Sequence, residues 1–424
     1  MNNEVSLLST NSRVAVPYVK VVVGDYTLGV FDKVTKRGQV DSYGVYTLNK
    51  IQYPNYIKSL QIQKLNGVVN KYTLALEYAI TEQNDPNFIE KIFGSIKDTR
   101  KIILSYGDVF IPSYSFKDEE AIVTKISKSF NIQSAVKSFT VTAISSGALA
   151  SSGTFTFEAK TIQPSVEIEN ILYNRNSEFG LLDLFYGMSN RDLVAQKKLI
   201  PHDDATINLE QKINMTVFDY LEYLTDCMQV ASERTQDKKT FFRLDFVDDI
   251  SGVFNGPYFR VVKINSLEDK EASYKIDVGV PDSKDIVIGL QEETDETFIL
   301  LYNFAENLTQ EHYVERINNR GEIYREYAPI ISSNSPERIQ TPQLKNWWAS
   351  VTEFPTKINL QIKGLLKPAI LMTHVRLNVY YFGKKDIISG LYIVTKQIDR
   401  IDATGYTTTL GLTRIGGSSL DSVV

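Results

Sequence analysis

Alternating apolar and polar positions run through the first 150 residues and predict short strands separated by turns. Residues 18–23 form a dense apolar run that stops at Gly24-Asp25, a pair typical of a tight hairpin turn. Residues 56–63 and 72–78 alternate at period two, and Asn66-Gly67 between them is a second hairpin signal. Three further strands are predicted at residues 101–106, 121–126 and 138–144. Many short strands at regular spacing favour a β-sandwich or barrel.

In the middle of the chain, the apolar residues change to a helical spacing. Residues 165–172 and 179–186 predict short helices, and an earlier short helix is predicted from Asp85-Pro86 to Ile92. The clearest helix is predicted over residues 217–232, where apolar residues recur at spacings of three and four. Strands predicted at residues 241–246 and 258–264 make this block α+β.

Strand patterns return after residue 274. They are predicted at residues 285–289, 298–304, 356–363, 376–382, 390–394 and 407–413. Among them, the acidic stretch from Glu292 to Glu296 predicts a solvated loop. Residues 307–323 are polar and turn-rich, and residues 342–350 predict a short helix that carries Trp347 and Trp348. The chain therefore contains two strand-rich blocks around an α+β insert.

Composition favours a globular, β-rich protein and argues against other classes. Hydrophobic residues make up 43% of the 424 residues and aromatic residues 11%, which suits pleated, half-buried surfaces. The net charge of −5, without a run of basic residues, argues against a protein that grips nucleic acid along its surface. One cysteine permits no intrachain disulfide. The polar start is unlike a signal peptide and no apolar stretch is long enough to span a membrane, so we expect assembly in a cytoplasm.

The residues that could carry chemistry are dispersed. His202, His312 and His374 lie far apart in sequence, and only His202 has carboxylates beside it, at Asp203-Asp204. A zinc site needs several closely spaced ligands, so a solvated loop is the favoured interpretation. Cys227 lies on the apolar face of the predicted helix, which favours core packing over a nucleophilic role.

The carboxylate runs and the tryptophan pair also favour structural interpretations. Neither Glu292–Glu296 nor Asp248-Asp249 has the order of residues in a calcium-binding loop. A hydrolase that uses Glu292 or Asp295 ranks last among the hypotheses. Trp347-Trp348 favours packing over ligand stacking. The common nucleotide-binding and hydrolase motifs are missing, so we predict no catalytic, cofactor-binding or metal-binding residues and no enzymatic activity.

The order of the blocks resembles that of tail hub and baseplate proteins of tailed phages, the family that includes late control protein D and the spike-carrying hubs. The resemblance in the last block runs through Trp347–Gly364, Arg376–Phe382, Gly390–Asp399 and Gly405–Arg414. The first block matches through residues 72–78, 85–94 and 102–108, and the insert opens at Pro164-Ser165. The stretch from Glu292 to Asn319 has no obvious counterpart.

The resemblance implies a mainly β protein with two similar hub β-barrels and an inserted helix-containing domain. The implied domains are a first barrel at 1–160, an α+β middle at 161–270, a second barrel at 271–415 and a flexible tail at 416–424. It also implies a virion tail subunit that forms a ring of three copies, or a multiple of three. Such a ring would join the tail tube to a spike or tail tip, with DNA passing through its lumen.

A β-rich receptor-binding or carbohydrate-binding baseplate protein is the alternative. The abundant tyrosines and Trp347-Trp348 motivate it.

Overall fold

The fold is that of a computed structural model of the chain. The described residues are 5–6, 17–29, 39–40, 46–48, 51–53, 56–65, 68–81, 85–94, 101–108, 117–173, 200–202, 206–228, 240–247, 258–265, 274–280, 287–294, 298–303, 313–317, 323–327, 356–364, 371–402 and 404–414.

The described elements are mainly strands. The first block holds β1 (Val5–Ser6), β2 (Pro17–Val23), β3 (Tyr26–Leu28), β4 (Gln39–Val40), β5 (Tyr46–Leu48), β6 (Ile51–Tyr53), β7 (Ile57–Leu65), β8 (Val68–Ala79), α1 (Phe88–Gly94), β9 (Lys101–Asp108), β10 (Lys117–Asn131), β11 (Val136–Ser145) and the 3₁₀ helix η1 (Ser146–Ser151). The middle holds β12 (Phe155–Phe157), β13 (Lys160–Ile162), α3 (Pro164–Tyr173), β14 (Ile207–Leu209), β15 (Lys212–Met215), α5 (Val217–Cys227), β16 (Thr240–Val247) and β17 (Tyr258–Asn265). The last block holds β18 (Tyr274–Val278), β19 (Val287–Thr294), β20 (Phe298–Asn303), β21 (Tyr313–Ile317), β22 (Ile323–Tyr327), β23 (Thr356–Lys363), β24 (His374–Tyr381), β25 (Lys384–Lys385), β26 (Gly390–Asp402) and β27 (Gly405–Arg414).

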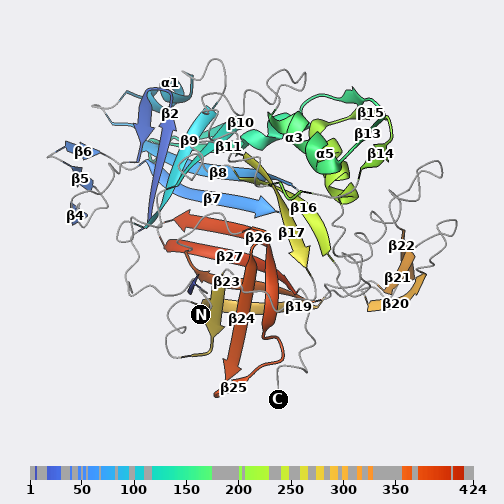
Figure 1. The fold of residues 1–424 in the computed structure, drawn as a ribbon. Helices are drawn as coiled ribbons and strands as arrows, with labels where there is room; N and C mark the ends of the chain where they lie inside the picture. Colours follow the sequence, from blue (N-terminus) through green and yellow to red (C-terminus); the bar gives the residue numbers. More distant parts are fainter. Residues whose placement is uncertain are drawn as a thin grey trace.

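One large sheet joins the first and last blocks (Figure 1). Strands β26, β7, β8, β11, β10, β9 and β2 are hydrogen-bonded neighbours in that order, and β2 at the far end comes back against β26. This part of the sheet therefore curls around one hydrophobic core. The alternation predicted from the sequence is the reason, because every second side chain of β7 and β8 points into that core.

Strand β26 belongs to both halves of the sheet. Its first residues pair with β24, as in His374 opposite Ile393, and its later residues pair with β7, as in Lys396 opposite Leu65. The register against β27 shifts between Val394 and Lys396. A bulge at such a point bends a strand and strengthens its twist, which lets β26 leave one half of the sheet and enter the other.

The described residues form three hydrophobic clusters. The first lies inside the curled sheet and takes Ile401 and Tyr406 from the C-terminal strands. The second packs α3 and α5 against β16 and β17, and the third lies under β23, β24, β26 and β27. The structure is therefore mainly β with a helix-containing middle, as the sequence predicts.

Helix α5 shows how local sequence sets an element. Thr216 caps its N-terminus by accepting a hydrogen bond from the backbone N–H of Asp219, and the apolar face of the helix is buried. The predicted end at residue 232 is wrong, because the backbone is already extended at Met228. Cys227 is fully buried in the second cluster, which confirms the packing role predicted for it.

Two predictions for the last block are also wrong. Glu292 and Glu293 were expected in a solvated loop, but they continue β19, which pairs with β23. Residues 307–323, expected to be turn-rich, contain β21 and lead into β22. In both places, cross-strand pairing outweighs the local polarity that suggested a loop: β19 pairs with the distant β23, and β21 pairs with its sequence neighbours β20 and β22.

Some sequence predictions lie outside the described residues. These are the helix at 179–186, the helix with Trp347 and Trp348, His312, Asp248-Asp249, the second half of the acidic stretch and the tail at 416–424. Within the described part of the chain, no helix is long and apolar enough to cross a membrane.

Candidate functional site

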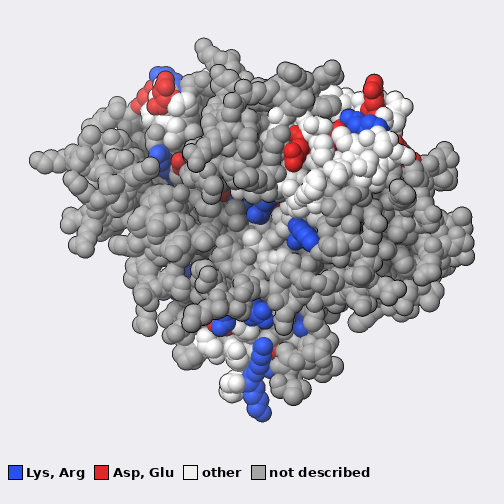
Figure 2. Space-filling view, viewed as in Figure 1, with Lys and Arg blue, Asp and Glu red and all other residues white. Residues whose placement is uncertain are grey.

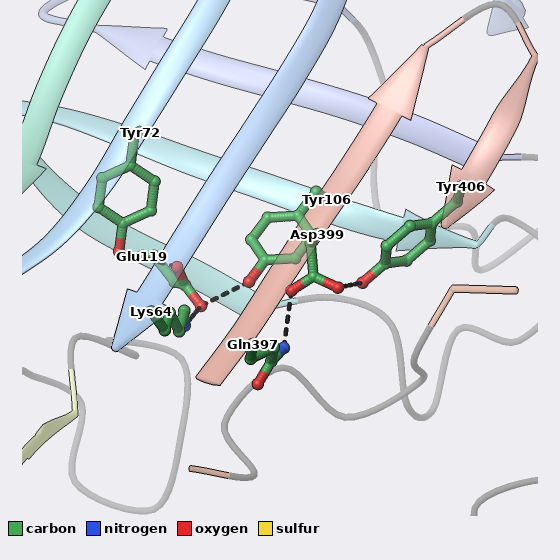
Figure 3. A network of polar contacts seen from close by, with 7 residues as sticks. All are labelled: Lys64, Tyr72, Tyr106, Glu119, Gln397, Asp399 and Tyr406. Carbon is green, nitrogen blue, oxygen red and sulfur yellow. Dashed lines mark hydrogen bonds and ion pairs between the residues drawn. The ribbon is translucent and has the colours of Figure 1, made fainter. Parts of the chain in front are cut away.

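A buried cluster of charged and hydroxyl side chains lies inside the curled sheet (Figure 3). Lys64 of β7 and Glu119 of β10 form an ion pair, and the two side chains are 3% and 0% exposed. Tyr72 and Tyr106 donate hydrogen bonds to the same carboxylate at 2.9 and 2.7 Å. Strands β8 and β11 lie between β7 and β10 in the sheet. The ion pair therefore reaches across the inside of the curled sheet and joins β7 to β10.

A second buried carboxylate extends this cluster into the C-terminal strands. Asp399 of β26 accepts hydrogen bonds from Thr408 at 2.5 Å, Gln397 at 2.7 Å and Tyr406 at 3.1 Å. Burial raises the pKa of Asp399 to about 6, although these donors and the nearby Lys64 favour its charged form. We call the two carboxylates and their partners the polar junction, because they lie where the N-terminal and C-terminal strands meet.

The polar junction has the composition of a catalytic site but not its access. Its carboxylates are fully buried, and they do not line the small cavity beside Asn70, Asp245 and Phe246. That cavity has room of about 20 Å³, which is about the size of one water molecule. The junction therefore lies in the packed interior, between the N-terminal and the C-terminal strands.

The structure does not gather the other candidate residues into a site. His202 is exposed, Cys227 is buried, and His374 is half-buried at the start of β24. Among the described residues, no group of three His, Cys, Asp or Glu side chains could hold a metal ion.

The outer half of β10 is an open strand edge. β9 pairs with β10 only as far as Ile122, whereas β11 continues to pair with it up to Asn131. Among the described strands, residues 124–131 therefore have a neighbour on one side alone. Such an edge presents unpaired N–H and C=O groups that can pair with another chain.

Apolar side chains line this edge. Ile126 and Phe130 are 43% and 52% exposed, and Ile132 beyond them is 82% exposed. Ile126 lies directly opposite the buried Val141, so it belongs to the core face of the sheet. The apolar face of the sheet therefore extends along β10 beyond the region that other described residues cover.

A second open edge lies in the other half of the sheet. Within the described strands, β19 pairs with β23 alone, and its Ile288 is 50% exposed. We call β19 and the outer half of β10 the two open edges.

No family model matches the chain, and no curated protein matches its sequence. The fold is similar to that of a tail protein from Neisseria meningitidis MC58, with a TM-score of 0.51 and 9% identity, over 96% of this chain and 99% of that one. A 43 kDa tail protein of prophage MuSo2 from Shewanella oneidensis has a TM-score of 0.48 and 9% identity, over 94% and 97%. A component of the E. coli type VI secretion system has a TM-score of 0.45 and 9% identity, over 88% and 77%.

The first of these similarities covers almost the whole of both chains. The chain therefore has the fold of a tail protein, and the predicted mainly β fold with a helix-containing middle is confirmed. At this identity the likeness is one of fold.

Proposed function

We propose that the chain is a non-enzymatic structural subunit of a phage tail hub or baseplate, which assembles into a closed ring of three copies or a multiple of three. In this proposal, the ring joins the tail tube to a spike or tail tip, and DNA passes through its lumen. The subunit acts in the virion tail and is assembled in the host cytoplasm. The domain division at residues 160, 270 and 415 is part of the same proposal.

The observation that carries this proposal is the pair of open edges in opposite halves of one sheet. A contact between two different surfaces of the same chain is head-to-tail, and repeated head-to-tail contacts close into a ring when the rotation allows it. The open edge of β10 carries uncovered apolar side chains, which a single subunit has no reason to expose. The similarity to a tail protein over nearly the full chain supports the same conclusion.

A double substitution at the β10 edge tests the proposal. Ile126→Lys with Phe130→Lys places charges on the edge without removing a buried group, so the subunit should fold and the ring should dissociate. Ile213→Lys is the matched control, because Ile213 is also an exposed strand isoleucine, at 65%. Sedimentation velocity measures the outcome. A native protein that stays monomeric at high concentration would contradict the ring, and a double variant that assembles normally would remove β10 from its interface.

A further inference from the structure

The hairpin that joins β24 to β25 ends in an unusual turn. Tyr381 pairs with Lys384, so Phe382 and Gly383 form a two-residue turn, with φ values of +52° and +80°. Turns of this kind strongly prefer Asn-Gly, because both positions need a left-handed backbone. A bulky aromatic residue with positive φ is a genuine outlier. The backbone is therefore strained at Phe382, a position where Asn would be accommodated more easily.

Nothing in the described part of the chain compensates for this strain. Phe382 is fully exposed, and Tyr381 and Ile387 near it are 54% and 55% exposed. A strained backbone is retained when the surrounding structure determines it, and such positions cluster at binding sites. Here the surroundings of the ring are solvent, so the compensating contact has to come from another molecule.

The base of the hairpin is held firmly, so the tip is preorganised. The backbone N–H of Asp386 donates to the carbonyl of Val379 at 2.8 Å, and the Asp386 carboxylate accepts from the N–H of Ile388 at 2.9 Å. The buried Ser389 hydroxyl accepts from the N–H of Val379 at 2.9 Å. A rigid tip loses little conformational freedom on binding, which favours its use as a docking element.

The tip is also basic. Lys384 and Lys385 are both exposed. In Figure 2, Lys and Arg atoms mark the lower end of the molecule, where Figure 1 places β25. A partner surface should therefore combine apolar contact with carboxylates.

The chain itself has a surface of this kind on α5. Asp219, Glu222 and Asp226 follow one another at spacings of three and four, which places them on one face of the helix. Phe218, half-buried, lies one turn before Glu222. Burial, followed by the nearby Asp226 and Asp219, raises the pKa of Glu222 to about 7, although Arg243, which pairs with Asp226 at 3.4 Å, favours the charged form of Glu222.

The geometry points to a contact between two copies: we propose that the tip of the β24–β25 hairpin docks on the acidic face of α5 in a second copy of this chain. Figure 1 places β25 and α5 at opposite ends of the molecule, so the tip of a subunit is remote from its own α5. The contact is head-to-tail, as a closed ring requires. The inference rests on the proposed ring and adds an interface to the open edges.

Three variants of the full chain test this contact by sedimentation velocity. Phe382→Asn removes the aromatic ring and suits the turn, and it should weaken association at least tenfold while the thermal midpoint is unchanged or higher. Lys385→Glu should also weaken association, because it opposes Glu222. Adding Glu222→Lys to the Lys385→Glu chain should restore association, since the exchanged carboxylate and ammonium groups then attract each other across two copies. Ile213→Asn is the control that removes an exposed apolar side chain elsewhere.

The outcomes separate this contact from the assembly itself. If the native protein forms a ring, and Phe382→Asn and Lys385→Glu form rings of unchanged affinity, the contact is overturned and the ring stands. The tip would then serve a different tail protein. A native protein that is monomeric at every concentration would overturn both proposals. Loss of association in Lys385→Glu without rescue by Glu222→Lys would overturn α5 as the receiving surface.

Discussion

Charged side chains are usually exposed and large apolar ones buried. The polar junction and the β24–β25 tip each depart from this rule, in opposite ways. The junction buries Glu119 and Asp399 completely, whereas the tip leaves Phe382 completely exposed. Each buried carboxylate has hydrogen-bond donors from the same chain, and Glu119 has Lys64 as well. The ring of Phe382 has no comparable covering from the described residues. An unusual feature that is satisfied within the chain indicates a structural role, and one that is not indicates another molecule.

The largest loss of stability is expected when the junction loses the ammonium group of Lys64. Lys64→Met leaves the Glu119 carboxylate buried without its ion-pair partner, which should lower the free energy of unfolding by about 3–5 kcal/mol. Urea denaturation measures it. Lys58→Met is the matched control, because the ion pair of Lys58 with Glu77 is exposed and should contribute less than about 1 kcal/mol. A loss at Lys64 no larger than that at Lys58 would show that this ion pair does not stabilise the curled sheet.

The second carboxylate of the junction should give a pH dependence. Because burial raises the pKa of Asp399 to about 6, its contribution to stability is present below about pH 4 and is lost as the pH rises through about 6. Asp399→Asn should remove this loss and raise the free energy of unfolding at pH 7.5 by about 1–3 kcal/mol. The amide of Gln397 can turn to accept from the new side chain, because its oxygen has no hydrogen-bond partner among the described residues.

Asp402 provides the control for this experiment. Hydrogen bonds from Thr404 lower the pKa of Asp402, so its contribution is present above about pH 4 and is lost as the pH falls. Asp402→Asn should therefore change the pH dependence of the free energy of unfolding in the direction opposite to that of Asp399→Asn. Two profiles of the same sign would refute the assignment of the pH dependence to Asp399.

A smaller effect of the opposite sign is expected at the exposed tip. Phe382→Asn relieves the left-handed strain of a bulky residue, and it should raise the free energy of unfolding of the isolated subunit by about 1 kcal/mol. Thermal unfolding of monomeric fractions measures it. A clear loss of stability would mean that Phe382 makes contacts within its own chain, and the comparison with the junction would fail.

The smallest effect on stability is expected at the open edge of β10. Ile126→Lys with Phe130→Lys should change the free energy of unfolding by less than about 0.5 kcal/mol, because both side chains are already largely in water. Hydrogen exchange of β10 and β11 would show whether the subunit keeps its structure. A large loss would indicate that the edge is covered within one subunit.

Much of the fold was predictable because it depends on neighbours in sequence. The alternation in β7, β8 and β23 and the helical spacing in α5 identify those elements directly. The place of β26 was not predictable, because its pairing with β7 joins residues more than 300 positions apart. The polar junction was missed for the same reason. Lys64, Glu119 and Asp399 are ordinary charges in the sequence and become a cluster only when the sheet curls.

The open edges were also beyond sequence analysis. Ile126 falls in a predicted strand, but its exposure follows from where β9 stops pairing with β10. Phe382-Gly383 gives no hairpin signal, because Asn or Asp is the residue expected before the glycine.

The mass of the purified protein in solution, with negative-stain images of the same fractions, tests the central proposal most directly. The proposed function predicts a ring-shaped particle with the mass of three copies, or a multiple of three. A strict monomer at all concentrations, with no ring in the images, would contradict it.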